Sequence, residues 1–191
     1  MIKAVSADKP LILDLLCRSF NNNKSVNFIT GNKPNQEKRI YALMDYSFEV
    51  CRLFGEIWLS DNRGACALIL YPQEKRTTIQ SIWLDIKLIA QAVGLKGISR
   101  LLHREAGIKK VQPKIPMIYL WFIGVDPVKQ RQGTGSQLLS EILADASQKR
   151  LPVYLETSTL GNLPWYESFG FEIYDQLVLD YTLFFLKYTL D

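Results

Sequence analysis

The residues with the clearest chemical potential lie in one short segment, Gln130 to Ser136, here called the glycine loop. It places Gly133 and Gly135 where a helical pattern begins. The first amide N–H groups of a helix have no partner inside the helix, and the helix dipole favours negative charge there. Glycine lets an anion approach that backbone closely. The glycine loop is therefore predicted to hold a phosphate group.

Two common nucleotide-binding motifs do not fit the glycine loop. A nucleotide P-loop would need a lysine directly after Gly135, where the chain has Ser136. A dinucleotide-binding loop would need a third glycine or an alanine at position 138, which is Leu138. Taken alone, the loop also fits a tight connection between a strand and a helix.

A strand and a helix must position the glycine loop. The strand is predicted at Ile118 to Val125, a nearly continuous apolar run that is typical of a strand buried on both faces. Asp126 and Pro127 end it. The helix after the loop carries apolar residues at the spacing of one buried helical face, namely Leu138, Leu139, Ile142, Leu143 and Ala146.

A second group of polar residues follows the predicted helix. Tyr154 to Thr157 is predicted as a strand, and Glu156 is a carboxylate in this otherwise apolar stretch. A carboxylate there is costly unless it is functional or paired. Glu156 is therefore either a reacting group or one held by a structural partner, such as a tyrosine hydroxyl or a backbone amide. Asn162 and Tyr166 follow in a segment that ends in a Gly-Phe pair.

These two groups together resemble the cofactor half of the GNAT acetyltransferases. In that family Gln-x-x-Gly-x-Gly on a strand-to-helix turn holds the diphosphate of coenzyme A, and the next strand leads to a short helix with Asn and Tyr that ends in Gly-Phe. The run LETSTLGNLPWYESFGF is similar to the corresponding segment of puromycin N-acetyltransferase and its relatives. The resemblance covers Tyr119 to Phe171 and leaves the acceptor half unassigned.

The resemblance implies a GNAT fold of the α/β (α+β) class, with a mixed central sheet of about seven strands flanked by helices. It implies direct transfer of an acetyl group from acetyl-CoA to a small-molecule amine in a ternary complex. The residues agree, because no cysteine or serine lies in an activated-nucleophile motif. A helical insertion is expected near 77–113, and residues 1–191 are expected to form a single domain.

The resemblance also implies roles for individual residues. Tyr166 occupies the general-acid position, where a phenol would protonate the leaving thiolate. Glu156 is the candidate general base, directly or through water; many GNAT enzymes carry the base on the preceding strand, which here offers Tyr119 and no carboxylate. The residues implied in acetyl-CoA binding are Ile123, Gly124, Val125, Gln130, Arg131, Gln132, Gly133, Thr134, Gly135, Ser136, Asn162 and Tyr166.

Other interpretations stay open at this level. The chain could be a CoA-binding sensor or regulatory domain without turnover, or an acetyltransferase for a protein amine. Tyr166 could be a core tyrosine at the sheet edge. Phe28 and Tyr46 are candidates for the acceptor wall, with core packing as the alternative.

Composition narrows the functional class. The chain has 191 residues, 48% apolar and 22% charged, which is ordinary for a globular domain. The formal net charge of +4 suits an anionic cofactor and is too weak to indicate a nucleic-acid partner. His103 is the only histidine, so no metal site and no Ser-His chemistry is predicted. The three cysteines, Cys17, Cys51 and Cys66, indicate a reduced, cytoplasmic protein.

The remaining elements follow from hydrophobic patterns. The predicted elements outside the cofactor half are a strand at Ile2 to Val5, a helix through Phe20, a loop at Ser25 to Gln36, a helix at Gln36 to Phe54, a hairpin of Glu56 to Ser60 with Ala65 to Tyr71, and strands at Phe171 to Leu179 and Tyr181 to Leu190. Phe184, Phe185 and Leu186 indicate burial on both faces or a subunit contact, which would make a homodimer.

The 77–113 insertion is predicted as two helices broken near Gly94 or Gly97. Its apolar positions come first and its basic positions follow, so they do not share one helix. This order favours an insert packed over the acceptor cleft over a membrane-surface segment anchored by Trp83. The residues expected on its solvated basic face are Lys96, Arg100, Arg104, Lys109 and Lys110.

Overall fold

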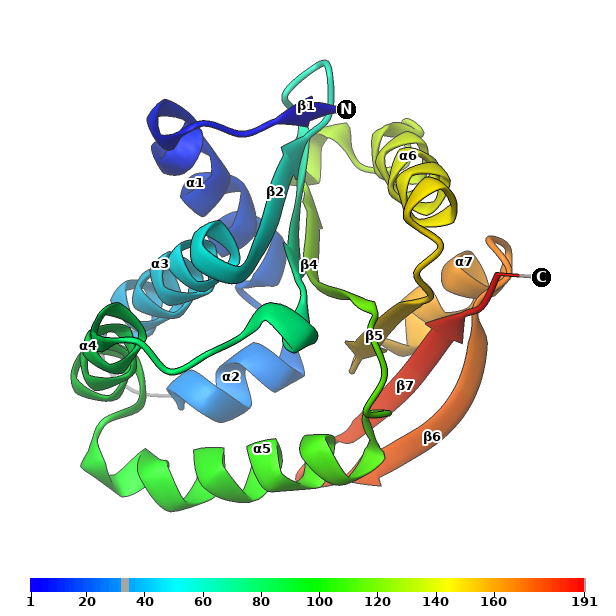
Figure 1. The fold of residues 1–191 in the computed structure, drawn as a ribbon. Helices are drawn as coiled ribbons and strands as arrows, with labels where there is room; N and C mark the ends of the chain where they lie inside the picture. Colours follow the sequence, from blue (N-terminus) through cyan, green and yellow to red (C-terminus); the bar gives the residue numbers. More distant parts are fainter. Residues whose placement is uncertain (32–34, 191) are drawn as a thin grey trace.

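Seven strands form one mixed sheet in the computed structural model, which describes residues 1–31 and 35–190 (Figure 1). The strand order is β1-β2-β3-β4-β5-β7-β6. The strands are β1 Ile2–Lys3, β2 Gly55–Leu59, β3 Ala65–Leu70, β4 Ile118–Val125, β5 Val153–Thr157, β6 Glu172–Val178 and β7 Thr182–Tyr188. The predicted mixed sheet of about seven strands is confirmed.

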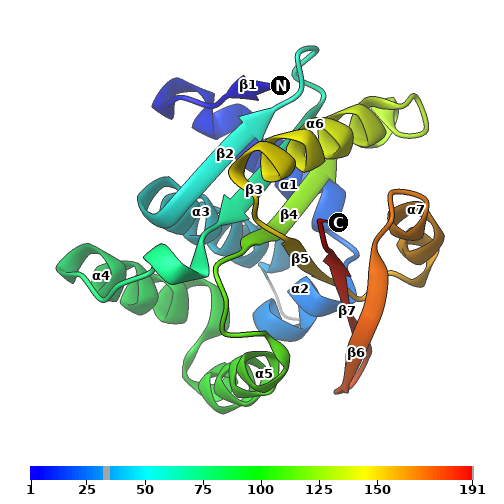
Figure 2. The same cartoon turned by 45° about the vertical axis from the view of Figure 1, so that its right-hand side comes forward.

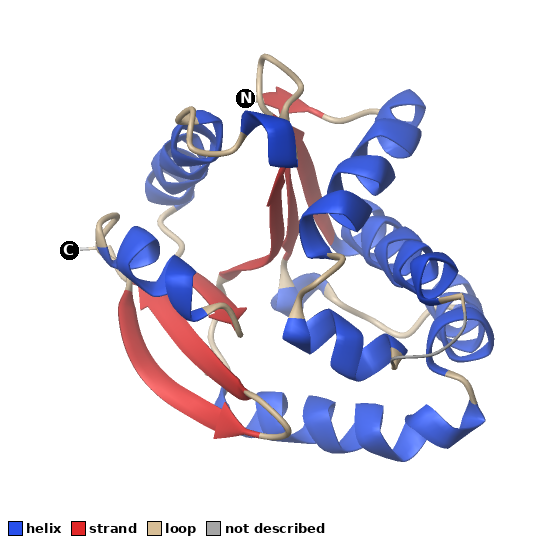
Figure 3. Ribbon diagram, turned by 180° about the vertical axis from the view of Figure 1, so that it is seen from behind, coloured by secondary structure: helices blue, strands red, loops and turns tan. Residues whose placement is uncertain are grey.

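Helices lie on both sides of this sheet (Figures 2 and 3). They are α1 Lys9–Phe20, α2 Lys24–Thr30, α3 Gln36–Phe54, α4 Ile79–Leu88, α5 Ile98–Val111, α6 Thr134–Lys149 and α7 Leu163–Glu167. One buried cluster joins α1 and α3 to the sheet, and a second joins α6 and α7 to its other face. The apolar face predicted for α6 is buried throughout. No helix in the described part of the chain is long and apolar enough to cross a membrane.

The strands β4 and β5 are parallel, but they pair over only a short part of their length. They pair at Ile118 with Val153 and at Tyr119 with Tyr154, and no further. On its other side β4 pairs with β3 from Tyr119 to Val125, with one irregularity. There Leu68 pairs with Phe122 while Ile69 pairs with Leu120, so the residue between, Trp121, forms a β-bulge. The sheet is therefore split beside the carboxyl half of β4, which keeps one edge unpaired.

One predicted loop is a helix. The segment Ser25 to Gln36 contains most of α2, and residues 32–34 of that segment lie outside the described residues. The Asn23 side chain caps α2 by accepting a hydrogen bond from the Val26 amide at 3.1 Å. Within α2, the side chains of Val26 and Thr30 are buried. The prediction was wrong because a helix of this length is specified by its cap and its packing more than by its apolar period.

The insertion consists of two helices, as predicted. α4 continues into a π-helical turn, Ile89–Val93, and Gly94 then adopts a φ of 70° that ends it. The predicted basic face is only partly correct, because Arg104 on α5 is buried. The outer face of α4 is apolar and exposed; its residues are Ile79, Ile82, Trp83 and Ile86.

Candidate functional site

A cavity of about 1010 Å³ lies at the split between β4 and β5, and it is called the cleft below. Its walls come from β4, β5, the insertion, α2, α3 and the segment around α7. Four of the predicted site residues line it, namely Ile123, Glu156, Asn162 and Tyr166. The glycine loop follows β4 in the chain and does not line the cleft itself. A hydrogen bond of 3.0 Å from the Trp165 indole N–H to the Ser136 hydroxyl joins α7 to the loop.

The backbone of the glycine loop has the geometry predicted for an anion site. Gly133 has a φ of 84° and directly precedes α6. The first hydrogen bond of α6 runs from the Gln137 amide to the Gly133 carbonyl at 2.8 Å. The amides from Arg131 to Ser136 donate no hydrogen bond to any other described residue. A Cβ on Gly133 would meet no atom within 4 Å, so the space beside Gly133 is open. Free N–H groups at the start of a helix favour an anion.

The side chains of the loop support its shape. The Gln130 side-chain amide donates to the Val125 carbonyl at 3.4 Å, and that of Gln132 donates to the Val128 carbonyl at 3.1 Å. The Thr134 hydroxyl accepts from Asn62 at 3.2 Å. These bonds hold the turn together, so the main-chain amides are the loop's candidate ligand donors.

Tyr166 lies on α7 with its phenol in the cleft wall. Its ring packs against Trp165 at 4.7 Å and against Phe171 at 5.6 Å between ring centroids. The hydroxyl makes no hydrogen bond with any other described residue. Burial raises the pKa of Tyr166 far above its usual value, so the phenol is protonated throughout the neutral range. A protonated, unengaged phenol can donate a proton within the cleft.

Glu156 lies on β5, partly buried in the wall of the same cleft. Its carboxylate accepts hydrogen bonds from the Tyr119 hydroxyl and from the Gln112 side chain, the latter at 3.0 Å. Burial raises the pKa of Glu156, while the nearby Arg104 charge and the Tyr119 bond act in the opposite direction. Glu156 thus has a tyrosine hydroxyl as a partner, one of the alternatives that the sequence left open. This partner, Tyr119, lies on β4.

One wall of the cleft is aromatic. Trp121, at the bulge, lies 6.1 Å from the Tyr46 ring in an edge-to-face arrangement. The Tyr46 hydroxyl donates to the Asp85 carboxylate on α4 at 2.8 Å. Tyr46 thus lines the cleft, whereas Phe28 packs against Tyr181 and does not. The sequence reasoning missed Trp121, because nothing in the apolar run marks which residue bulges.

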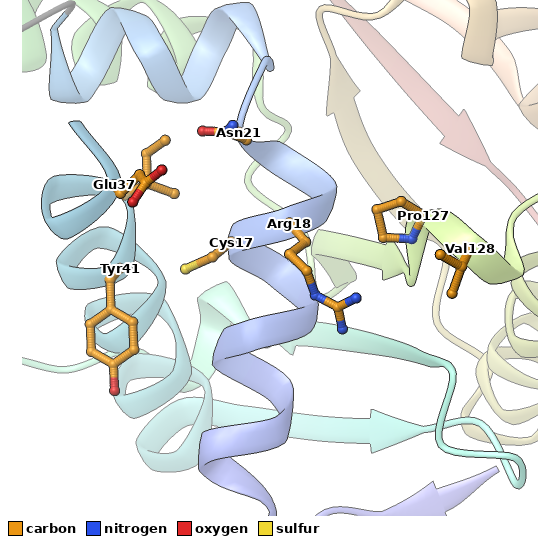
Figure 4. A pocket seen from close by; sticks show the side chains of 8 residues that line it. Cys17, Arg18, Asn21, Glu37, Tyr41, Pro127 and Val128 are labelled. Atoms are coloured by element: carbon orange, nitrogen blue, oxygen red, sulfur yellow. The ribbon is translucent and has the colours of Figure 1, made fainter.

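A smaller cavity of about 620 Å³ lies beside α1 and α3 (Figure 4). Cys17, Glu37, Tyr41 and Pro127 are among its lining residues. Burial raises the pKa of the Cys17 thiol to about 11, so the thiol is protonated at neutral pH. This cavity contains no predicted site residue and no activated nucleophile.

A comparison with known protein families matches the segment that contains the glycine loop and the cleft residues Ile123, Glu156, Asn162 and Tyr166. Residues 82–173, a little under half of the chain, match the family described as the acetyltransferase (GNAT) domain. This segment of the chain is therefore similar to an acetyltransferase domain of the GNAT family. A Schizosaccharomyces pombe protein named as an uncharacterized N-acetyltransferase is 42% identical over 60 residues, which is 31% of this chain and 24% of the relative. The match thus spans about a quarter of that relative's length.

Solved structures agree with the GNAT assignment at the level of fold. A Corynebacterium glutamicum protein described as histone acetyltransferase HPA2 and related acetyltransferase has a TM-score of 0.75 at 19% identity, over 98% of this chain and 94% of that one. Arylalkylamine N-acetyltransferase 2 from Aedes aegypti has a TM-score of 0.67 at 15% identity, over 100% and 98% of the two chains. The chain therefore has the GNAT fold.

Proposed function

We propose that the protein is an N-acetyltransferase that transfers an acetyl group directly from acetyl-CoA to a small-molecule amine. The observation that carries the proposal is the cleft at the split sheet, with Glu156 and Tyr166 in its walls and the open glycine loop beyond the end of β4. The GNAT domain match supports the reaction type.

In this proposal, main-chain groups make most of the contacts to acetyl-CoA. The unengaged amides of the glycine loop, Gln130 to Ser136, bind the diphosphate of acetyl-CoA. The unpaired edge of β4 at Ile123, Gly124 and Val125 binds the amide-bearing pantetheine arm as a sheet edge binds a peptide. Asn162, exposed at the cleft, adds a side-chain hydrogen bond.

Tyr166 and Glu156 each carry out one of the two proton transfers in the proposed reaction. Tyr166 protonates the leaving thiolate, because its phenol is buried, protonated and without another partner. Glu156 accepts a proton from the amine, directly or through a water molecule. An amide of β4 beside the split can stabilise the oxyanion of the transition state.

The cleft favours a small acceptor over a protein chain. It is concave, it has aromatic walls, and its volume of about 1010 Å³ is in the range of small-molecule sites. The resemblance to puromycin N-acetyltransferase in the segment of Asn162 and Tyr166 points the same way. A CoA-binding domain without turnover, or a protein-amine acetyltransferase, would be revealed by the test below.

The first test is binding followed by turnover. Calorimetric titration with acetyl-CoA is expected to show micromolar binding, and release of the CoA thiol should then depend on an added amine. Small aromatic amines and short peptides with a free amino terminus are compared as acceptors. Binding without any amine-dependent release would contradict the enzyme assignment, and no binding of acetyl-CoA would contradict the whole proposal.

Replacing Glu156 by glutamine is expected to lower kcat/KM by about 10–100-fold. In the wild type, activity should fall as pH decreases through the raised pKa of Glu156, because the protonated acid cannot accept a proton. The variant should lose this acidic limb of the pH–rate profile. Glu167→Gln, an exposed position on α7, is the matched control and should keep it.

Folding stability gives a second readout for Glu156. Because its pKa is raised in the folded state, its ionisation opposes folding. The protonated Glu156 side chain therefore makes the folded state relatively more stable at low pH. This contribution to the free energy of unfolding is lost as pH rises through the folded-state pKa of Glu156. Denaturant unfolding of Glu156→Gln should lack this dependence. An unchanged pH–rate profile in the variant would assign Glu156 a purely structural role.

A further inference from the structure

The carboxylates that line the cleft already have partners within the protein. Each accepts a hydrogen bond from a side chain of another part of the chain or of its own helix. The pairs are Asp85 with Tyr46, Glu105 with Arg104, and Glu156 with Tyr119 and Gln112. The negative groups of the cleft are therefore largely satisfied before any acceptor binds.

The lysines of the cleft are not matched in the same way. Lys75, Lys109 and Lys114 line it with exposed side chains, and none of them forms an ion pair with another described residue. Lys75 and Lys114 lie near the amino end of β4, because Lys114 shortly precedes this strand and the Gln73 side chain accepts a hydrogen bond from the Met117 amide at 3.2 Å. The glycine loop follows the opposite end of β4. These lysines thus border the end of the cleft that the cofactor leaves free.

Arg104 is the central cation of this arrangement. Its side chain is only 9% exposed, although it lines the cleft. Its guanidinium donates to the Tyr181 hydroxyl at 3.1 Å, to the Ser25 hydroxyl at 2.9 Å and to Glu105 at 2.7 Å. Two of these partners are uncharged, and the third, Glu105, is 44% exposed.

The bonds of Arg104 leave it unsatisfied as a donor. A guanidinium has five N–H groups in a planar fork, and three hydrogen bonds to other described residues leave two of them free. A buried guanidinium is costly unless charge and hydrogen bonds compensate it. The partners from α2, α5 and the residue before β7 hold the group in one orientation at the cleft wall. Such a fixed fork is suited to a carboxylate.

We propose that the acceptor of this transferase carries a carboxylate in addition to its amine, and that Arg104 binds this carboxylate while the amine faces Glu156. The inference rests on the proposed function and specifies its substrate class. Trp121 and Tyr46 form the apolar wall, so the acceptor has an aromatic or large apolar body between or beside the two polar groups. Arg104 is in this view a specificity-determining residue.

The test uses pairs of acceptors that differ only in the carboxylate. Phenylalanine is compared with phenethylamine, and 4-(aminomethyl)benzoate with benzylamine, which places the carboxylate near to and far from the amine. A charge-assisted pair contributes about 1.5–3 kcal/mol, so KM for the carboxylated member of at least one pair should be about 10–100-fold lower. The inference is overturned if neither carboxylated acceptor has a lower KM than its partner.

Variants of two neighbouring arginines localise the effect. Arg104→Met should remove the preference. Because the Arg104 charge also lowers the pKa of Glu156, the preference is measured as the ratio of the two KM values within each acceptor pair. Arg100→Met is the matched control, one helical turn earlier on α5, where the guanidinium lies 5.3 Å from the Phe28 ring and does not line the cleft. It should keep the preference. If Arg104→Met does not fold, Arg104→Lys serves instead, because it keeps the charge and loses the fork.

Binding separates this inference from the proposed function. The same acceptor pairs are titrated calorimetrically into the protein saturated with CoA. Tighter binding of a carboxylated member without any thiol release in the acetyl-CoA assay would support the inference and contradict turnover. Release of thiol with no preference for a carboxylate would support turnover and contradict the inference.

Discussion

Replacing Tyr166 by phenylalanine is expected to lower kcat by about 10²–10⁴-fold without changing the affinity for acetyl-CoA. The substitution removes one oxygen and keeps the ring that packs between Trp165 and Phe171. Because the hydroxyl has no hydrogen-bond partner among the described residues, its loss leaves no buried group unsatisfied. The effect should therefore appear in chemistry, measured as CoA-thiol release, and be absent from calorimetric binding.

Tyr154→Phe is the matched control for this experiment. Tyr154 is also a buried tyrosine, it lies on β5, and its ring packs against Tyr174 at 5.6 Å rather than lining the cleft. This variant should keep the parent kcat. Since burial raises the pKa of Tyr166 far above neutrality, the wild type should also show no loss of activity from its ionisation near pH 9. Parent turnover in Tyr166→Phe would remove the general-acid role and leave Tyr166 as a core residue.

The parts of the fold that the sequence predicts well are those with a strong local period. The helix at Gln36–Phe54 and the apolar face of α6 follow directly from residues spaced at three and four positions. The bounds of β4 follow from an apolar run closed by Asp126 and Pro127. In each case the signal lies within the segment itself, so no knowledge of distant neighbours is needed.

The features that make a cleft depend on neighbours that are distant in the sequence. The split between β4 and β5 and the bulge at Trp121 are matters of strand register, which an apolar run does not encode. The pairing of Glu156 with Tyr119 joins two strands separated by α6. The sequence could name both residues as polar groups near the site, but only the fold brings their side chains together.

Arg104 illustrates the same limit on the acceptor side. In the sequence it is one basic residue in a basic stretch, where the ordinary expectation is a solvated face. The fold places it against Ser25 and Tyr181, from segments before and after it in the chain, and so buries it. Burial of one charge among several similar residues is a tertiary property that residue spacing alone does not reveal.

Replacing Gly133 by valine is expected to abolish measurable binding of acetyl-CoA while the protein remains folded. The φ of 84° at this position is a conformation that β-branched residues strongly disfavour, at a cost of about 1–3 kcal/mol. Relief of that strain would turn the amides of the glycine loop away from a common anion. The added side chain would also occupy the open space beside Gly133, within the glycine loop itself. Calorimetry with acetyl-CoA measures the loss.

Gly161→Val separates this local effect from a general effect of added bulk. A Cβ on Gly161 also meets nothing within 4 Å, but Gly161 does not have a positive φ. It should bind acetyl-CoA like the parent, and both variants should unfold cooperatively in denaturant. The cost of strain predicts a modestly lower unfolding free energy for Gly133→Val alone. If Gly133→Val kept the parent affinity, the glycine loop would not be the diphosphate site, because the substitution disturbs the backbone that positions its amides.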